Sequence, residues 1–335
     1  MTTPSEFALW ISESEAVSMM DIGGAICALE QGLIEEAKGS AQNMIKTHVE
    51  WDGSTLHAIG AVFPEMGICG TKTWSHTRDG ATPLLVLFDS NNGSLKAIIE
   101  AFALGQLRTA AASGVATRWL AAPSADQFAM IGAGKQAITQ VAAVLAVRPV
   151  RTIRVFSRDE TRRNQFVARL QSEFQVEVTA AASVREALNC ASIVSIATRA
   201  TDPIVTADML QPGAHINSIG AIVPSRAEIS QDVLARSTQI VTDSVPQAQK
   251  LSREMIEFFG KDPAKWDAVQ PLADIVSNRF SRAASDDLTL FKALGVGISD
   301  LSLGIELYRK ALETGLGYRF APPKRVNPRL HGLVG

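Results

Sequence analysis

The stretch IGAGKQA at residues 131–137 constrains the fold of this chain more than any other feature of its sequence. An apolar run of strand type precedes it, and a helical pattern follows it. In a strand–turn–helix unit, Gly132 permits the tight turn and Gly134 lets the backbone approach a pyrophosphate, while Ala137 is small enough for the helix to pack on the strand. The context predicts a dinucleotide-binding site. The alternative is a glycine turn that merely joins a strand to a helix.

Short apolar strands alternate with helices throughout the block that contains this turn, from residue 123 to residue 289. The predicted strands are QFAMIGAG, TIRVFSR, QVEVTA, SIVSIAT, HINSIGA and QIVTDS. Near-continuous apolar strands that alternate with helices indicate α/β architecture with a doubly wound parallel sheet, the Rossmann type. The linker Ala122-Pro123-Ser124 opens the block.

A chain of 335 residues is too long for one ordinary domain and fits two. Two further blocks flank the middle one. The first, residues 1–122, opens with one mixed helix over 12–39 and continues with strand-like runs. A hairpin turn is expected at 91–93, and a helix over 104–121 ends the block. The third, residues 290–335, begins directly with a long helix and ends in a tail that contains Pro and Arg.

The composition excludes several classes of protein. With 32 basic and 34 acidic residues, the net charge of -2 creates no field that would gather nucleic acid or an anionic membrane. No eighteen apolar residues run uninterrupted, so no membrane span is expected. The 3 cysteines are odd in number and far apart, which predicts neither a disulfide framework nor a zinc site and favours the cytoplasm.

The end of the second strand of the middle block, at Ser157 and Arg158, bears on the choice of cofactor. An NAD site usually has Asp or Glu here, which accepts hydrogen bonds from the ribose hydroxyls. This chain has a hydroxyl and a guanidinium instead, with Arg162 and Arg163 one turn later, and a guanidinium fork suits a phosphate. The pattern favours NADP(H) over NAD(H). A solvated arginine surface is the alternative, and Asp159 stands one residue late for an NAD site.

Segments over nearly the whole chain resemble the ornithine cyclodeaminase/mu-crystallin family, in the family's order. They are GTKTWSH (70–76), LFDSNNGSLKAIIEA (87–101), LGQLRTAAASGVATRWLA (104–121), IGAGKQA, SIVSIAT (192–198), LQPGAHINSIGA (210–221), VTDSVPQA (241–248) and FKALGVGISDLSLG (291–304). The resemblance implies that the first and third blocks form a discontinuous α+β substrate and dimerisation domain, beside the Rossmann domain of the middle block. It also implies a homodimer and hydride exchange between a nicotinamide and the α-carbon of an amino or imino acid.

The resemblance further implies roles for single residues. Lys72 matches a family lysine that faces the nicotinamide and holds the substrate carboxylate or assists proton transfer. Arg108 matches the arginine that binds this carboxylate, and Lys46 lies where many members have a basic residue near it. His48 and His76 are candidate proton donors, with satisfied structural histidines as the alternative. The expected cofactor contacts are Thr109, Gly132, Ala133, Gly134, Lys135, Gln136, Ser157, Arg158, Arg162, Ala197, Thr198, Asn217, Ile219, Gly220 and Val296.

One departure from the family bears on the reaction. The cyclodeaminase needs an acidic residue shortly after the glycine of its SIGA-like segment, and this chain has Ile222 there, with Glu228 six residues later. We therefore predict an NADPH-dependent reductase of a small 2-imino acid, for example a cyclic ketimine such as pyrroline-2-carboxylate, or the reverse amino-acid dehydrogenase. The alternatives are an ornithine cyclodeaminase with bound NAD and a non-catalytic, mu-crystallin-like protein that binds NADPH or another ligand.

Overall fold

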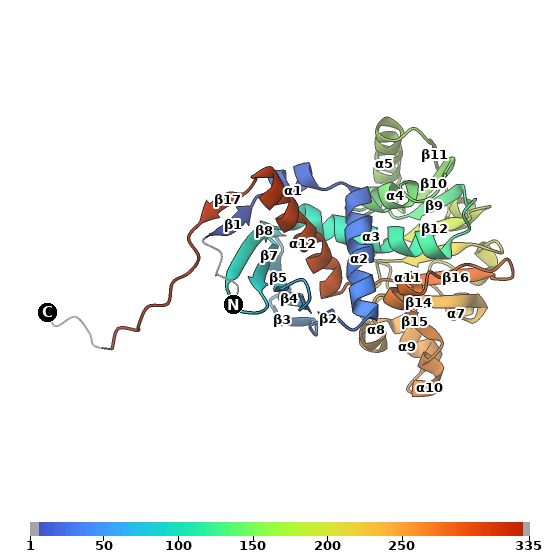
Figure 1. Ribbon diagram of the computed structural model, residues 1–335. Helices are drawn as coiled ribbons and strands as arrows, with labels where there is room; N and C mark the ends of the chain where they lie inside the picture. Colours follow the sequence, from blue (N-terminus) through green and yellow to red (C-terminus); the bar gives the residue numbers. More distant parts are fainter. Residues whose placement is uncertain (1–6, 331–335) are drawn as a thin grey trace.

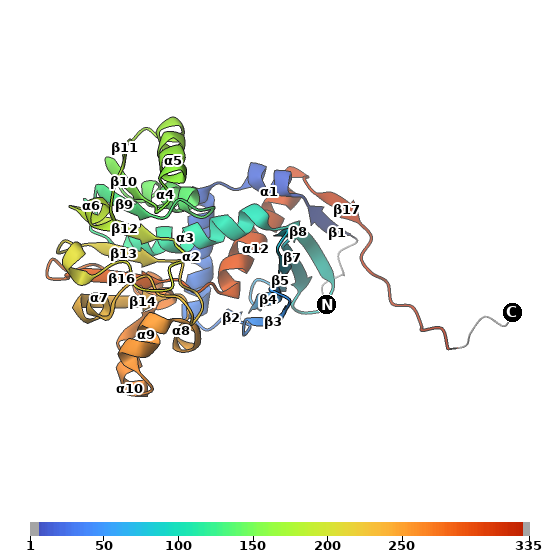
Figure 2. The ribbon, with the colours of Figure 1, turned by 180° about the vertical axis from the view of Figure 1, so that it is seen from behind.

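The chain folds around two sheets, and three long helices lie between them (Figure 1). The computed structural model describes residues 7–330, so the outer ends of the first and third predicted blocks lie outside the described residues. The three helices are α2 (Ile22–Ala37), α3 (Phe102–Leu120) and α12 (Gly297–Thr314). Figure 2 shows that α3 runs from the first sheet to the second.

The second sheet is parallel throughout, and this confirms the predicted Rossmann-type fold class. Its strands are β9 (Gln127–Ile131), β10 (Thr152–Phe156), β11 (Glu177–Ala180), β12 (Ile193–Ile196), β13 (His215–Ser218), β14 (Ser237–Thr242), β15 (Val269–Pro271) and β16 (Leu288–Lys292). They lie in the order β11-β10-β9-β12-β13-β16-β14-β15. The chain fills one side of β9 first and then continues on the other side at β12. The carboxyl ends of β9 and β12 are thus the switch point at which such sheets bind ligands.

The first sheet combines strands from both ends of the chain. Its strands are β1 (Ala8–Ile11), β2 (Gln42–Asn43), β3 (Thr47–Trp51), β4 (Ser54–Phe63), β5 (Ile68–Thr77), β6 (Gly80–Ala81), β7 (Leu84–Asp89), β8 (Leu95–Glu100) and β17 (Tyr318–Phe320). The order is β17-β1-β8-β7-β5-β4-β2, with β3 paired to β4 and β6 paired to β5. The predicted hairpin is confirmed: β7 and β8 are antiparallel, and Gly93 adopts φ 74° in the turn between them.

The remaining helices cover the parallel sheet or precede α2. They are α1 (Glu13–Met19), α4 (Ala137–Leu145), α5 (Glu160–Glu173), α6 (Val184–Leu188), α7 (Gln231–Arg236), α8 (Val245–Leu251), α9 (Arg253–Phe259), α10 (Pro263–Trp266), α11 (Leu272–Ser277) and the 3-10 helix Ala207–Met209. No single helix within residues 7–330 is long and apolar enough to cross a membrane. Only the bent pair α1 and α2 meets that test, by length and composition alone.

The prediction of one helix over 12–39 is wrong, because two helices, α1 and α2, meet there at 86°. Met20 is extended, and the side chain of Asp21 accepts a hydrogen bond from the backbone N–H of Gly24, 2.7 Å away. This N-cap starts a new helix. The capping signal at Asp21 was present in the sequence, inside a run of helical spacing.

The prediction of a helix that starts at residue 290 is also wrong in its first residues. Leu290, Phe291 and Lys292 belong to β16, which pairs with β13 on one side and β14 on the other. Gly295 adopts φ 84° after the strand, and α12 begins at Gly297. The division of the chain at residue 290 therefore falls inside a central strand of the parallel sheet. An apolar run buried on both faces reads equally well as a strand or as a core helix.

Small residues on α3 allow the three central helices to approach one another closely. A Cβ atom built on Gly114 would lie 2.6 Å from Cδ1 of Ile26 in α2. Residues of α2, α3, α11 and α12 share one apolar core, to which Val241 of β14 and Phe291 of β16 also belong. This shared core fixes the first sheet relative to the parallel one.

Candidate active site

A cavity of about 1200 Å³ lies along the carboxyl ends of the parallel strands and reaches the first sheet. One side is formed by the segments that follow β9, β10, β12, β13, β14 and β16. The other is formed by β5, the loop before β3 and the start of α3. The predicted site residues that line it are Lys46, His76, Arg108, Thr109, Gly132, Ala133, Gly134, Lys135, Gln136, Ser157, Arg158, Arg162, Ala197, Thr198, Ile219 and Gly220.

The glycine turn fits the pyrophosphate of a dinucleotide. Gly132 adopts φ 116°, and a Cβ atom on it would lie 2.5 Å from the carbonyl oxygen of Ala197. A Cβ atom on Gly134 would meet nothing within 4 Å and would point into open space. The following helix, α4, has no side-chain cap at its N-terminus. The N–H of Ala137, the first residue of α4, donates to the carbonyl oxygen of Gly134 at 3.0 Å. The start of α4, which carries no side-chain cap, and the open space beside Gly134 together suit an anion.

Two exposed guanidinium groups line the cavity where β10 ends. Arg158 and Arg162 lie there together with Ser157 and Asp159. The Asp159 carboxylate caps α5: it accepts a hydrogen bond from the backbone N–H of Arg162 at 3.0 Å and lies 3.3 Å from the Nε of the same residue. Arg163 points back and donates to the carbonyl oxygen of Ser157 at 2.9 Å. The Asp159 carboxylate is therefore engaged by the helix.

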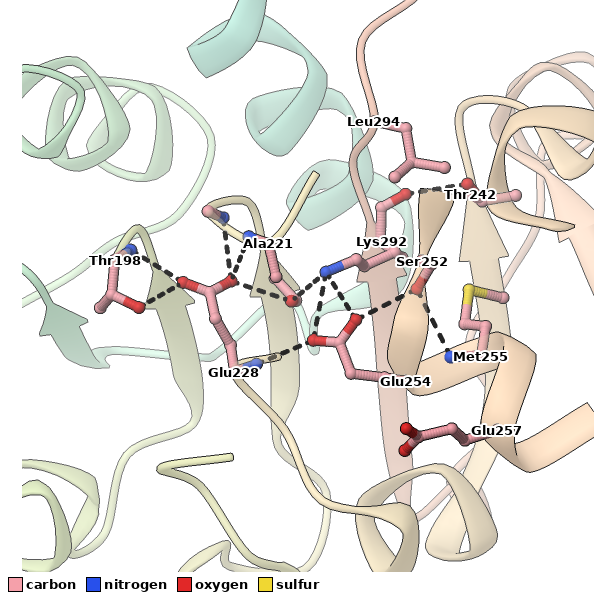
Figure 3. A network of polar contacts seen from close by, with 12 residues as sticks. Thr198, Ala221, Glu228, Thr242, Ser252, Glu254, Met255, Glu257, Lys292 and Leu294 are labelled. Atoms are coloured by element: carbon pink, nitrogen blue, oxygen red, sulfur yellow. Dashed lines mark hydrogen bonds and ion pairs between the residues drawn. The ribbon is translucent and has the colours of Figure 1, made fainter. Parts of the chain in front are cut away.

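A buried carboxylate, Glu228, holds two strand ends of the cavity together (Figure 3). One oxygen accepts from the backbone N–H and the hydroxyl of Thr198, each at 2.8 Å. The other accepts from the hydroxyl of Ser218 at 3.1 Å and from the N–H groups of Gly220 and Ala221 at 2.9 and 3.3 Å. Thr198 and Gly220 face the cavity on their other side. Glu228 thus fixes the ends of β12 and β13 relative to each other.

Figure 3 shows how this network continues to β16 and α9. The Lys292 ammonium lies 3.1 Å from the Ser218 hydroxyl and 3.1 Å from a carboxylate oxygen of Glu254. Glu254 also accepts the backbone N–H of Glu228 at 2.8 Å. Both oxygens of Glu228 are occupied and the residue is fully buried, so it does not present an acid to the cavity. Ile222 lines the cavity instead.

Lys72 lies behind the cavity wall on the first sheet. The residue is 4% exposed, its ammonium is hydrogen-bonded to the carboxylate of Asp300, and the ammonium nitrogen lies 5.1 Å from the centre of the Trp74 ring. Trp74 lines the cavity, whereas Lys72 itself is not among the lining residues. Burial lowers the pKa of Lys72 to about 8, against the opposing effect of Asp300; the nearby Arg108 lowers it further. Lys72 thus lies just behind the wall of the cavity, where its ammonium is paired with Asp300, and its role toward a substrate stays a prediction.

Arg108 and Lys46 line the cavity on the Lys72 side. The Nε atom of Arg108 lies 3.4 Å from Asp300, and a Cβ atom on Gly295 would lie only 2.7 Å from Nη1 of Arg108. A side chain at 295 would therefore displace the guanidinium from this position, and the φ of 84° at Gly295 also favours glycine. Burial lowers the pKa of Lys46, and the positive charge of Arg108 acts in the same direction. The two cations are within reach of a single anionic group.

Two acidic residues of this region have no role in the sequence-based prediction. Asp300, in the first turn of α12, is fully buried against Lys72. Asp243 follows β14, lines the cavity and accepts the backbone N–H groups of Leu294 and Gly295 at 3.0 and 2.7 Å. Burial raises the pKa of Asp243. A lone acid inside the apolar stretch GVGISDLSLG was the available signal for Asp300.

Two predicted cofactor contacts, Asn217 and Val296, do not line the cavity, and the hydroxyl of a third, Thr109, is already engaged. Asn217 is fully buried, and its amide donates to the hydroxyl of Thr117 on α3 at 2.9 Å, because it points to the helix-covered face of β13. Val296 is fully buried in the apolar core at the start of α12. Thr109 lines the cavity, but its hydroxyl donates to the carbonyl oxygen of Gly105 one turn earlier, which uses its single proton.

The two predicted histidines differ in position. His76 is exposed and lines the cavity. His48 is exposed on β3 and stacks on His57, whose ring centre is 5.5 Å away, and His57 stacks in turn on Trp74 at 4.6 Å. Burial, followed by the charge of Lys46, lowers the pKa of His57 to about 4. His48 thus belongs to an aromatic stack beside the cavity.

Comparisons with known proteins agree with this geometry. The model of the ornithine cyclodeaminase/mu-crystallin family matches residues 11–315. A Delta(1)-pyrroline-2-carboxylate reductase of Bacillus cereus is 30% identical over 270 residues, which cover 79% of this chain and 81% of that protein. Ketimine reductase mu-crystallin of Rattus norvegicus is 31% identical over 217 residues, which cover 65% and 66%. The structure of Thermococcus litoralis Delta(1)-pyrroline-2-carboxylate reductase with NADH and L-proline superimposes with a TM-score of 0.86 at 26% identity, over 92% of this chain and 99% of that one.

Proposed function

Because the chain belongs to the ornithine cyclodeaminase/mu-crystallin family, we propose that it reduces the C=N bond of a small 2-imino acid with NADPH. Its broader class, an NAD(P)-dependent oxidoreductase of this family, follows from the family match and the reductases that it resembles. The preferred substrate is a cyclic ketimine such as pyrroline-2-carboxylate, and the reverse reaction is oxidation of the corresponding amino acid.

The proposal rests on one observation: a single cavity is lined by the glycine turn at 132–134 and by the two cations Lys46 and Arg108. A bound nicotinamide would supply the hydride. Arg108 and Lys46 are placed to take the substrate carboxylate, for which a guanidinium fork is well suited. Lys72, directly behind them, has a pKa of about 8 and can hold or release a proton near neutral pH. Arg108 and Lys46 thus orient an α-imino acid, and Lys72 keeps a proton source directly behind the wall of the pocket.

Apolar groups complete the substrate end and favour reduction over cyclodeamination. Ile59, Trp74 and Ile222 line the cavity, which suits a hydrocarbon ring or side chain. The acid that ring closure requires is replaced by Ile222, and the carboxylate of Glu228 is taken up by five donors behind the wall. The cyclodeaminase alternative therefore lacks its acid at the expected place.

The preference for NADP(H) is the finer part of the proposal. Arg158 and Arg162 are exposed beside Ser157 where a 2′-phosphate would lie, and Asp159 is engaged as the cap of α5. Two guanidinium groups favour a phosphate over a free hydroxyl. The Thermococcus litoralis relative was solved with NADH, so NAD(H) remains the alternative that the experiment must test.

A homodimer is proposed from the first sheet. All residues of β3 are exposed, and within residues 7–330 β3 pairs only with β4. Its Val49 and Trp51 are 58% and 44% exposed, and Leu56 of β4 is 46% exposed. An apolar edge strand of this kind is a liability unless it is covered, and a second copy of the chain is the proposed cover.

The cytoplasmic location stays a prediction, supported by three cysteines that are free in the structure.

A comparison of NADPH and NADH over a panel of cyclic and linear 2-imino acids tests the function. We expect oxidation of the nicotinamide, seen as loss of its absorbance, with a higher kcat/KM for NADPH and for a cyclic ketimine. No turnover with any imino acid would contradict the proposal. Release of ammonia and proline from ornithine, without net change of the nicotinamide, would favour the cyclodeaminase. Tight NADPH binding without turnover, unchanged in Lys72→Ala, would favour a non-catalytic binding protein.

A further inference from the structure

Asp300 stands where three separate elements meet behind the cavity wall. It comes from the first turn of α12, is fully buried and contacts Lys72 of β5 through Oδ1. The same oxygen lies 3.4 Å from Nε of Arg108 on α3. Its other oxygen, Oδ2, has no hydrogen-bond partner within the described part of the chain. A buried carboxylate without a full set of donors is costly unless cations neutralise it, and here two cations do so.

The charges around Lys72 are unbalanced without this carboxylate. Lys72 is faced by Arg108 from α3 and by Lys46 from the loop before β3, and both disfavour its protonated form. Burial acts in the same direction. Asp300 opposes these effects, both through its charge and through its hydrogen bond. Asp243 is the other carboxylate of this region, and it acts on Lys46.

We propose that Asp300 is the positioning residue of this site, which holds Lys72 as a cation and aligns it with Arg108 behind the substrate pocket. It contacts neither substrate nor cofactor. The backbone of α3 passes close to the pair, because a Cβ atom on Gly105 would lie 3.8 Å from the Lys72 ammonium. Asp300 therefore sets both the place and the charge of an amine whose surroundings otherwise favour the neutral form. The catalytic meaning of this inference rests on the proposed function, but its physical content can be measured without turnover.

Competitive labelling of lysines with acetic anhydride, followed by peptide mass spectrometry over a range of pH, reports the protonation of Lys72. In the full-length wild-type protein we expect a labelling midpoint at about pH 8. In Asp300→Asn, which keeps the size of the side chain and removes its charge, the midpoint should fall by about one to three pH units. The alkaline limb of the pH profile of kcat/KM should move in the same direction.

Ser302→Ala is the matched control, since Ser302 is buried on the same helix and donates only to the carbonyl oxygen of Ile298 at 2.7 Å. It removes a polar group from α12 without altering the charges near Lys72, so the midpoint should stay in place. If Asp300→Asn does not fold, as judged by circular dichroism, Asp300→Ser provides the same loss of charge with a smaller side chain.

An unchanged midpoint in a folded Asp300 variant would overturn the inference while the proposed function stands. An equal shift in Ser302→Ala would also overturn it, because the effect would then come from the packing of α12. If the wild-type protein turns over no imino acid and the midpoint still shifts in Asp300→Asn, the proposed function fails and the assignment of Asp300 holds.

Discussion

At the scale of residues, the substrate end of the cavity is defined by charges that the interior keeps close together. Burial lowers the pKa of both Lys46 and Lys72, and the positive charge of the nearby Arg108 acts in the same direction. One fully buried carboxylate, Asp300, partly neutralises them. An excess of positive charge in a half-enclosed site favours a small anion, and a carboxylate satisfies it with the fewest atoms.

The shape of the Arg108 side chain is expected to matter beyond its charge. Arg108→Lys keeps one positive charge and loses the planar fork of donors. We expect KM for the imino acid to rise by about 10- to 100-fold, as for the loss of a charged hydrogen bond, with little change in the dissociation constant of the nucleotide. Steady-state kinetics and fluorescence titration of the cofactor measure the two effects separately. A similar loss in both would contradict a role confined to the substrate.

The choice between the two cofactors depends on Arg158. Arg158→Glu should lower kcat/KM for NADPH by about 10- to 100-fold and leave that for NADH nearly unchanged, since only NADPH carries a 2′-phosphate. Arg151→Glu is the control, because Arg151 is an exposed arginine at the opposite end of β10. An equal effect of Arg158→Glu on both cofactors would refute the assignment.

At the scale of elements, the cofactor half of the site is a row of strand ends that must stay in register. The ends of β12 and β13 are tied together by Glu228, and Asp243 ties the end of β14 to the segment after β16. These carboxylates accept backbone N–H groups that would otherwise be unpaired inside the protein. They hold neighbouring strand ends together on the side of the cavity that the parallel sheet forms.

Replacement of Glu228 should weaken the binding of the nicotinamide half of the cofactor more than the binding of its adenosine half. In the wild type, N–H and O–H donors bind both carboxylate oxygens of Glu228. In Glu228→Gln, the NH2 group of the new side chain would face some of these donors, and the lost hydrogen bonds would cost about 1–3 kcal/mol. We expect affinity for NADPH to fall about 10-fold or more, while the nicotinamide-free analogue 2′-phospho-ADP-ribose binds nearly as before. Isothermal titration with both ligands measures this. Equal losses for the two ligands would indicate general damage to the sheet.

At the scale of the whole molecule, the first sheet and the parallel sheet are joined through one apolar core that contains α2, α3 and α12. Glu36 of α2 lies half-buried at this junction and accepts a hydrogen bond from the amide of Asn43 at 2.7 Å. Burial raises the pKa of Glu36 to about 7, and the charges of Asp243 and Asp274 contribute in the same direction. The folded state therefore favours the protonated form of Glu36 up to about pH 7.

The stability of the chain should fall between mildly acidic and mildly alkaline pH through Glu36. Its pKa is about 7 in the folded state and near the ordinary value of 4.5 when unfolded, so the stabilisation is complete below pH 4.5 and is lost as the pH rises through 7. Glu36→Gln imitates the protonated form and should raise the free energy of unfolding at pH 8 by about 1–3 kcal/mol, with little gain at pH 5. Thermal unfolding at the two pH values measures this.

Glu35→Gln is the neighbouring control, and it should not stabilise the protein, because hydrogen bonds lower the pKa of Glu35. A pH-independent gain in Glu36→Gln would contradict the argument.

The proposed dimer makes a prediction at the same scale. Trp51→Glu places a charge on the exposed apolar edge of the first sheet, and we expect it to convert a dimer into a monomer in sedimentation analysis. Val17→Glu is the control, since Val17 of α1 is 56% exposed and lies outside that edge. A wild-type monomer, or a variant as dimeric as the wild type, would exclude this interface.

Several features of this protein depend only on patterns that are local in the chain. The glycine turn, the hairpin at Gly93, the alternation that produces a parallel sheet and the family were all predictable, because each follows from residues that are near in sequence or from recognisable segments. The local pattern gave a wrong prediction at β16, because a buried apolar run fits a strand as well as a helix. It also gave a wrong prediction at Asp21, where an N-cap interrupts a run of helical spacing.

The positions of the buried charges, in contrast, depend on how the helices and sheets pack together. Lys72 meets Asp300 across 228 residues, and Glu228 turns away from the cavity toward the backbone of two strands. Such pairings depend on which face of a strand or helix is covered, and this is set by the packing of α3 and α12 between the two sheets. A charge removed from water takes the partner that the fold brings within reach, and no spacing along the chain encodes that partner.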